Sequence, residues 1–226
     1  MSLESQGAHG TMRFGTAGIY HSNLGAGAEL NYRFALHDLL DLQVDYPGYT
    51  QLDMGSVRLQ YFPGNKTFLF DELTIVKILR LPVLTAQWDQ LSWSVEVGGR
   101  SLRESFCSYC GVGSASGGIG ATVQPTSLPV DLWMLVEAEI IASPAFTGFF
   151  IKPSLGPRAG IRLRLTPELN ALVSAAYRYR FTSPITTVWE GRAHVRWAFA
   201  RNWALDGRCS WEQDGLSVSA GIALYD

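Results

Sequence analysis

The 226-residue chain carries a formal net charge of −2, with 17% charged, 12% aromatic and 47% hydrophobic residues. The near-neutral balance argues against nucleic-acid binding, which needs a basic face, and the hydrophobic content argues against disorder. No stretch is apolar enough for a membrane-spanning helix, which needs about twenty residues. Residues 1–11 lack the features of a signal peptide, so we expect a disordered or cloning-derived leader followed by one domain over 12–226.

Apolar and polar residues alternate with a period of two along most of the chain, which is the pattern of strands with two different faces. Turn-forming residues, such as those at 63–66 and 182–184, separate the runs. The pattern predicts about twelve strands, near 12–20, 23–35, 51–62, 67–79, 90–104, 114–124, 130–142, 155–165, 169–181, 186–199, 203–212 and 216–225. Most are long enough to cross a bilayer at a tilt. We therefore expect an all-β fold, a single antiparallel up-and-down β-barrel that spans a membrane.

The chemistry of the two faces separates a membrane barrel from a soluble one. The apolar faces carry large aromatic residues near strand ends, among them Tyr177, Trp189 and Trp197, as the interfacial girdles of membrane barrels do. The polar faces are rich in Arg and Glu, which favours charges that face one another across a confined lumen. The alternative is a soluble barrel that holds an apolar ligand among inward Tyr and Trp residues.

Charged residues on the alternating strands are the predicted lumen network. An unpaired buried charge would cost several kcal/mol, so these residues are expected to form ion pairs. The network comprises Glu137, Glu139, Arg162, Arg164, Arg178, Arg180, Glu190, Arg192, Arg196, Arg208 and Glu212. Such residues can brace a filled barrel or line a selective pore, and a twelve-stranded lumen allows both.

Two other segments could carry a site. The connection at 36–50 contains His37, Asp38 and Asp41, which could form a binding patch or a general base, although a short turn packed on the barrel rim is the favoured interpretation. Cys107 and Cys110 form a CxxC in a predicted Gly/Ser-rich hairpin. Too few ligands accompany them for zinc, so we expect a local disulfide, with two free thiols as the alternative.

Enzymatic chemistry has little support in the sequence. Outer-membrane hydrolases place a Ser-His pair on the outer wall, whereas His194 alternates with Trp and Val on the charged face. We therefore expect no catalytic residues, no metal, no cofactor and no hydrolase activity.

Several short segments resemble the C-terminal barrel domain of a bacterial outer-membrane family whose members carry an Lnb-like, cysteine-dependent periplasmic domain ahead of the barrel. The matching segments are 35–41, 48–49, 51–61, 91–95, the Cys107–Cys110 pair and 117–120. The resemblance spans roughly residues 12–181 and implies a catalytic domain ahead of residue 1. The activity of that domain is not expected of these residues.

The resemblance implies a structural and anchoring role in the bacterial outer membrane, with membrane lipid and the periplasmic domain as partners. A small-solute or ion pore is the second hypothesis, and the soluble barrel is the third. An even strand number puts both termini on the periplasmic side. We expect a monomer, with the 36–41 connection as a docking loop for the preceding domain: Leu36, Leu39 and Leu40 would form apolar contacts, with His37, Asp38 and Asp41 at the rim.

Overall fold

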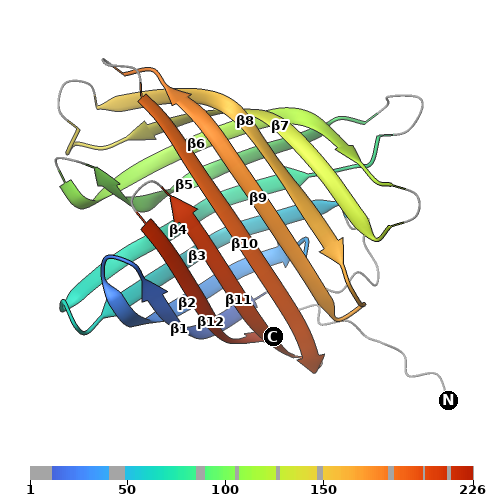
Figure 1. Ribbon diagram of the computed structural model, residues 1–226, viewed down its shortest axis with the longest axis horizontal. Coiled ribbons are helices and arrows are strands. Elements are labelled where there is room, and N and C mark those ends of the chain that lie inside the picture. The colour runs from blue at the N-terminus through green and yellow to red at the C-terminus, as the bar shows by residue number, and fades with distance from the viewer. Residues whose placement is uncertain are drawn as a thin grey trace.

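The computed structural model describes residues 12–40, 49–84, 90–104, 107–125, 128–146, 150–182, 186–200, 202–212 and 215–225. These residues form a closed, antiparallel up-and-down barrel of twelve strands (Figure 1), as predicted. The strands are β1 (Met12–His21), β2 (Gly25–His37), β3 (Thr50–Phe62), β4 (Thr67–Arg80), β5 (Ser92–Glu104), β6 (Cys107–Val123), β7 (Val130–Ala142), β8 (Ile151–Arg164), β9 (Leu169–Arg180), β10 (Thr186–Ala200), β11 (Trp203–Glu212) and β12 (Gly215–Tyr225). The described part of the chain contains no helix that could span a membrane.

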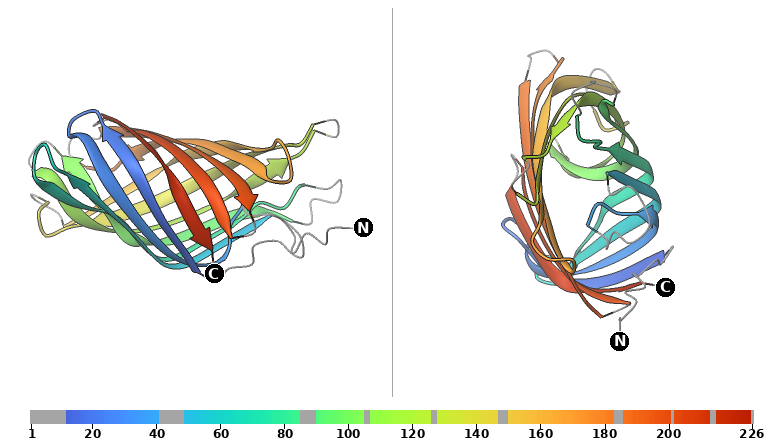
Figure 2. Two further views of the ribbon diagram at one scale, coloured as in Figure 1. Left: turned by 90° about the horizontal axis from the view of Figure 1, so that it is seen from below. Right: turned by 90° about the vertical axis from the view of Figure 1, so that its right-hand side faces the viewer.

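The barrel closes where β1 pairs with β12, in a ladder from Arg13↔Tyr225 to His21↔Ser217. We call the end where β1 begins and β12 ends the terminal end, and the opposite end the far end. The cross-section is oval rather than round (Figure 2). Opposite walls are therefore close enough for long side chains to meet across the lumen.

Two strands begin earlier than their side-chain pattern predicts. Strand β6 begins at Cys107 rather than near residue 114, and β8 begins at Ile151 rather than near residue 155. Both extensions are held by backbone pairing, Glu104↔Cys107 to β5 and Ala142↔Ile151 to β7. A backbone ladder needs no alternation of side chains, so the sequence pattern misses these ends.

The outer wall is apolar, with aromatic residues gathered near both ends of the strands. The far-end belt contains Tyr20, Tyr61, Phe68, Tyr177, Tyr179, Phe181 and Trp189. The terminal-end belt contains Phe14, Phe34, Trp197, Phe199 and Trp203. Aliphatic residues such as Val195 and Ile222 are exposed between the belts, as in a barrel that faces lipid. The soluble barrel with inward Tyr and Trp residues is therefore wrong.

Two glycines show why particular residues are needed in the wall. Gly55 has a φ of 67° and is skipped in the ladder between Met54↔Phe34 and Ser56↔Arg33, so it forms a bulge in which glycine is favoured. Gly191 on β10 lies beside the Trp211 indole of β11, and a Cβ there would come within 1.9 Å of Trp211 Cε2. The glycine makes room for the ring.

Apolar clusters occupy the two ends of the lumen. The terminal-end cluster consists of Leu39, Leu79, Leu81, Trp133 and Leu135. Two far-end clusters form around Phe62 and around Phe146. The length of lumen between them contains most of the buried charged residues.

Candidate functional site: the charged lumen

A cavity of about 270 Å³ lies inside the barrel. It reaches from His21 and Gly215 near the far end to Asp38 and Leu40 near the terminal end. Counting Arg, Lys, Asp and Glu, eight cationic and ten acidic side chains line it. The cavity is thus a polar compartment inside an apolar outer wall.

Three glutamates in the far half of the barrel are covered by arginines. Glu137 on β7 is 1% exposed and pairs with Arg178 of β9 and with Arg158 of β8, the latter at 3.3 Å. Arg178 also reaches Glu190 of β10 at 3.1 Å and Glu139 at 3.6 Å. Each buried carboxylate therefore has a guanidinium partner from another strand, which offsets the cost of its burial.

Arg100 on β5 connects two walls of the barrel. Its Nη2 lies 3.1 Å from Glu139 Oε1 on β7. Its Nη1 lies 3.6 Å from Glu190 Oε2 on β10. Because β6 to β9 lie between β5 and β10 in the wall, the second contact crosses the lumen.

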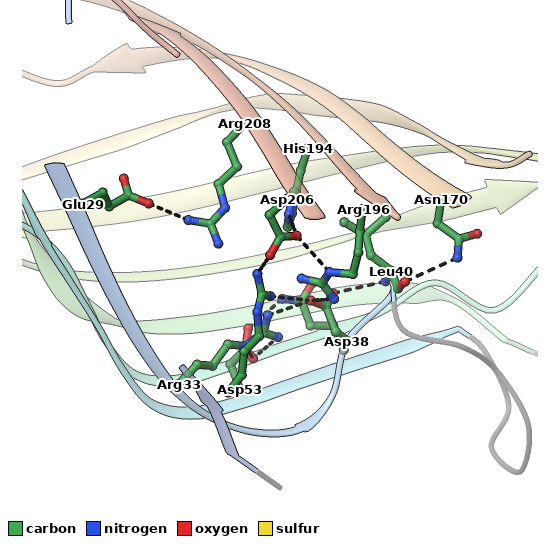
Figure 3. Close-up of polar contacts among 12 residues, drawn as sticks. Glu29, Arg33, Asp38, Leu40, Asp53, Asn170, His194, Arg196, Asp206 and Arg208 are labelled. Carbon is green, nitrogen blue, oxygen red and sulfur yellow. Dashed lines mark hydrogen bonds and ion pairs between the residues drawn. The ribbon is translucent and has the colours of Figure 1, made fainter. Parts of the chain in front are cut away.

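A second cluster of charges lies nearer the terminal end and contains three arginines and three aspartates, most of which are labelled in Figure 3. The arginines are Arg13, Arg33 and Arg196, and the aspartates are Asp38, Asp53 and Asp206. Arg33 pairs closely with Asp53, and Arg13 pairs closely with Asp206. Arg196 Nε donates to Asp206 Oδ1 at 3.0 Å. The six formal charges of these side chains cancel.

Asp38 comes from the connection after β2, and not from a strand. Arg33 Nη1 and Arg196 Nη1 donate to its Oδ2 at 2.6 and 2.7 Å. Burial by itself would raise the pKa of Asp38, but the facing guanidinium groups of Arg196 and Arg33 hold this pKa well below its ordinary value. Asp38 is therefore a carboxylate at neutral pH.

The residues after Asp38 turn into the barrel, which corrects part of the docking expectation. Leu39 and Leu40 are each 2% exposed, Leu39 within the terminal-end apolar cluster. Asn170 of β9 donates to the Leu40 carbonyl at 3.3 Å. Leu39, Leu40 and Asp38 are thus enclosed by the barrel and do not form an exposed docking surface. The side chains of Leu36 and His37, and all of Asp41, lie outside the described residues.

Two ion pairs pass over β12, the strand that closes the barrel. Arg13 of β1 pairs with Asp206 of β11, and Arg208 of β11 lies 2.9 Å from Glu29 of β2. The inward residues of β12 along this stretch are small: Ser217, Ser219, Gly221 and Ala223. Small side chains leave room for the longer ones to meet above them.

Other pairs complete the network, and some of their members lie outside the predicted set. Arg58 lies 3.1 Å from Asp71 and 3.0 Å from Glu72, and Lys77 lies 2.8 Å from Glu96. Asp131 accepts from the predicted Arg162 at 2.7 Å and from Arg164 at 3.1 Å. The missed members of the network as a whole are Arg13, Glu29, Arg33, Asp38, Asp53, Arg58, Asp71, Glu72, Lys77, Glu96, Arg100, Asp131, Arg158 and Asp206. The alternation of apolar and polar residues that identifies the network members at 189–199 is also present at 29–33 and 53–58, and it could have identified the members there.

The remaining predicted members occupy looser or more distal positions. Arg192 lies 3.9 Å from Glu190, and its side chain is 32% exposed. Arg180 is buried at the far end of β9, and Glu212, at the far end of β11, lines the cavity. The structure thus brings Glu137, Glu139, Arg178, Glu190 and Arg192 together, and places Arg196 and Arg208 in other groups.

The CxxC pair lies in the β5–β6 hairpin. Cys107 and Cys110 are at the start of strand β6, paired with the end of β5. Cys110 is disulfide-bonded, and Cys209 is a free thiol. The side chain of Cys107 lies outside the described residues, so its pairing with Cys110 stays a prediction.

Histidine and metal chemistry have little support in the described ranges. His194 lies in the lumen, and its Nε2 is 2.8 Å from Asp206 Oδ1; no hydroxyl group contacts it there. Within these ranges, no group of three or more His, Cys, Asp or Glu residues is arranged to hold a metal ion.

The fold is that of bacterial outer-membrane barrel proteins, and the apolar outer wall is that of a barrel in a lipid bilayer. The chain belongs to the family described as "Domain of unknown function (DUF7840)", whose profile matches residues 5–225. A search of curated proteins finds no match.

Three solved structures show the likeness of fold. The NanC porin is 7% identical with a TM-score of 0.55, covering 94% of this chain and 99% of that one. The KdgM porin, in complex with disordered oligogalacturonate, is 6% identical with a TM-score of 0.50, covering 95% and 99%. A structure described as a bacterial polysaccharide outer membrane secretin is 10% identical with a TM-score of 0.50, covering 96% and 99%.

Proposed function

We propose that the chain forms a narrow outer-membrane channel for small polar solutes and ions. The cavity of about 270 Å³ carries this proposal, because charged and polar side chains line it along much of the barrel. Among the described residues, the apolar clusters lie near the two ends of the lumen. Two of the three similar folds are described as porins, which supports a channel.

The charges of the cavity suggest what would pass. Its lining contains ten acidic and eight cationic side chains, and rings of acidic residues favour cations in channels. Because most of these charges are paired, we expect only a weak preference for cations over anions.

Single-channel recording in planar bilayers tests this proposal. Purified, refolded protein should give small, uniform conductance steps. In a KCl gradient, the reversal potential should shift toward the equilibrium potential of potassium. Protein that is folded by the criterion of heat-modifiable gel migration, yet gives no steps and releases no small sugars from liposomes, would contradict a channel.

An anchoring role is the second candidate, in which the barrel holds a fused periplasmic domain and acts as a monomer. The observation that favours it is the obstruction of the lumen, by Arg100–Glu190 in the far half and by Leu39 and Leu40 near the terminal end. A pure anchor would conduct no ions as the wild-type protein. The same bilayer recordings therefore separate the two roles.

A further inference from the structure

The three arginines around Asp38 form a site that fits a carboxylate. They come from three strands, β1, β2 and β10, and converge on one oxygen of Asp38. The Nη1 atoms of Arg33, Arg196 and Arg13 lie 2.6, 2.7 and 3.9 Å from that oxygen. Guanidinium groups match carboxylates in charge and in planar geometry. The occupant, however, belongs to a connection and not to the wall (Figure 3).

Charge balance shows that this site requires an anion. Besides Asp38, the described carboxylates that pair with these arginines are Asp53 and Asp206, so removal of Asp38 leaves three guanidinium groups beside two of these carboxylates. His194 also contacts Asp206 and supplies no negative charge. The side chains of all three arginines are at most 10% exposed. A deficit of negative charge around buried cations is unfavourable, so departure of Asp38 favours the binding of another anion.

We propose that this three-arginine site is a carboxylate-binding site, that Asp38 is its built-in occupant, and that a small carboxylate-bearing solute displaces it. The site is reachable from within the barrel, because Arg33, Asp38, Asp53 and His194 all line the central cavity. The inference rests on the proposed channel only for the route by which the solute arrives.

Displacement has a consequence for the terminal end of the lumen. Asp38 holds the segment 38–40 through its ion pairs, and the packing of Leu39 and the hydrogen bond from Asn170 to the Leu40 carbonyl also attach this segment. A solute that binds the arginines in place of Asp38 removes these ion pairs, so the segment 38–40 is less firmly attached. Carboxylate binding and withdrawal of Leu39 and Leu40 are then coupled, and each favours the other.

Chemical rescue of Asp38→Ala by acetate tests the site itself. Acetate supplies the carboxylate that the substitution removes and fits the space it leaves, whereas acetamide has nearly the same shape without the charge. Acetate should raise the apparent thermal midpoint of the refolded variant by about 2–4 °C at saturation. Acetamide should raise it by less than a quarter of that shift. If Asp38→Ala does not fold without an anion, the same comparison is made on its folding yield.

Asp38→Asn is the matched control, because the amide fills the site and leaves no room for acetate. Acetate should stabilise this variant and the wild type much less than Asp38→Ala. Equal effects of acetate and acetamide on Asp38→Ala, or equal effects of acetate on both variants, would overturn the proposal.

Bilayer recordings separate this inference from the channel proposal. In the wild type, replacing potassium chloride by potassium acetate should increase the fraction of time that the channel is open at least twofold, and Asp38→Ala should already be open for a larger fraction of the time. Rescue by acetate in a barrel that never conducts would retain the site and reject the channel. Conductance without any acetate-specific effect would retain the channel and reject the carboxylate-binding site.

Discussion

Arg100 on β5 and Glu190 on β10 approach each other to 3.6 Å across the lumen, although four strands lie between them along the shorter way around the barrel. The contact holds two opposed walls together in the far half of the barrel. It is possible because the barrel is oval (Figure 2) and because an arginine side chain is long.

Removal of Arg100 should widen the lumen. Arg100→Ala breaks the contacts with Glu139 and Glu190, although Glu190 keeps Arg178 at 3.1 Å. We expect a higher single-channel conductance and a loss of about 1.5–3 kcal/mol of stability, the contribution of a charged hydrogen bond. The conductance and the stability of Arg100→Lys, which retains the charge, should lie between those of Arg100→Ala and those of the wild type. An unchanged conductance in Arg100→Ala would argue against the contact as a constriction.

The outer face of β10 should not tolerate a charge. Val195 lies between the two aromatic belts and is 43% exposed on the apolar wall. Val195→Arg should cost roughly 2–4 kcal/mol in a bilayer and block insertion into lipid vesicles, measured by heat-modifiable migration. Val195→Leu should insert normally. Normal insertion of the arginine variant would mean that this face does not contact lipid.

Two glycines on neighbouring strands provide a matched test of packing on the wall. Gly191→Ala would force its Cβ into the Trp211 ring, whereas a Cβ at Gly207 meets nothing within 4 Å. Gly191→Ala should therefore destabilise the barrel by about 1–3 kcal/mol, the typical cost of overpacking. Gly207→Ala should be close to neutral. Urea unfolding in detergent micelles measures both, and equal effects would show that Trp211 moves aside freely.

The orientation of the barrel can be read by labelling. With twelve strands, both ends of the barrel domain lie on one side, expected to be periplasmic. In a Cys209→Ser background, an impermeant maleimide on intact cells should label Gly64→Cys at the far end and not Glu168→Cys at the terminal end. The opposite pattern would invert the topology. Lysed cells, in which both sites react, provide the control.

The state of the cysteines is also open to direct measurement. Cys110 is disulfide-bonded and Cys209 is free, and we predict Cys107 as the partner of Cys110. Denatured, unreduced protein should react with one equivalent of maleimide, and with three after reduction. Cys107→Ser should raise the unreduced value to two. A value of three before reduction would rule out the disulfide in the mature protein.

Alternation in the sequence predicts the barrel well, because the two faces of a strand meet different surroundings. At 189–199 it places Glu190, Arg192 and Arg196 on one face and Trp189 and Val195 on the other, as the structure has them. The strand order then follows from the short connections.

The choice of partners within the lumen could not be predicted in the same way. Arg13 meets Asp206 only because β1 and β12 pair, and Arg100 meets Glu190 only because the barrel is oval. Asp38 was missed as a lumen residue because it lies in a connection, where no periodicity shows which way a side chain points. Closure and shape are properties of the whole sheet, and no short stretch of sequence contains them.

The ion pairs that pass over β12 can form only when the barrel closes. Until β1 and β12 pair, Arg13 lacks Asp206, and Glu29 lacks Arg208. An open sheet would therefore leave these lumen-facing charges, on and next to its free edges, without their partners from across the seam. Closure brings these opposite charges together along with the backbone ladder. The closed barrel is thereby favoured over an open sheet.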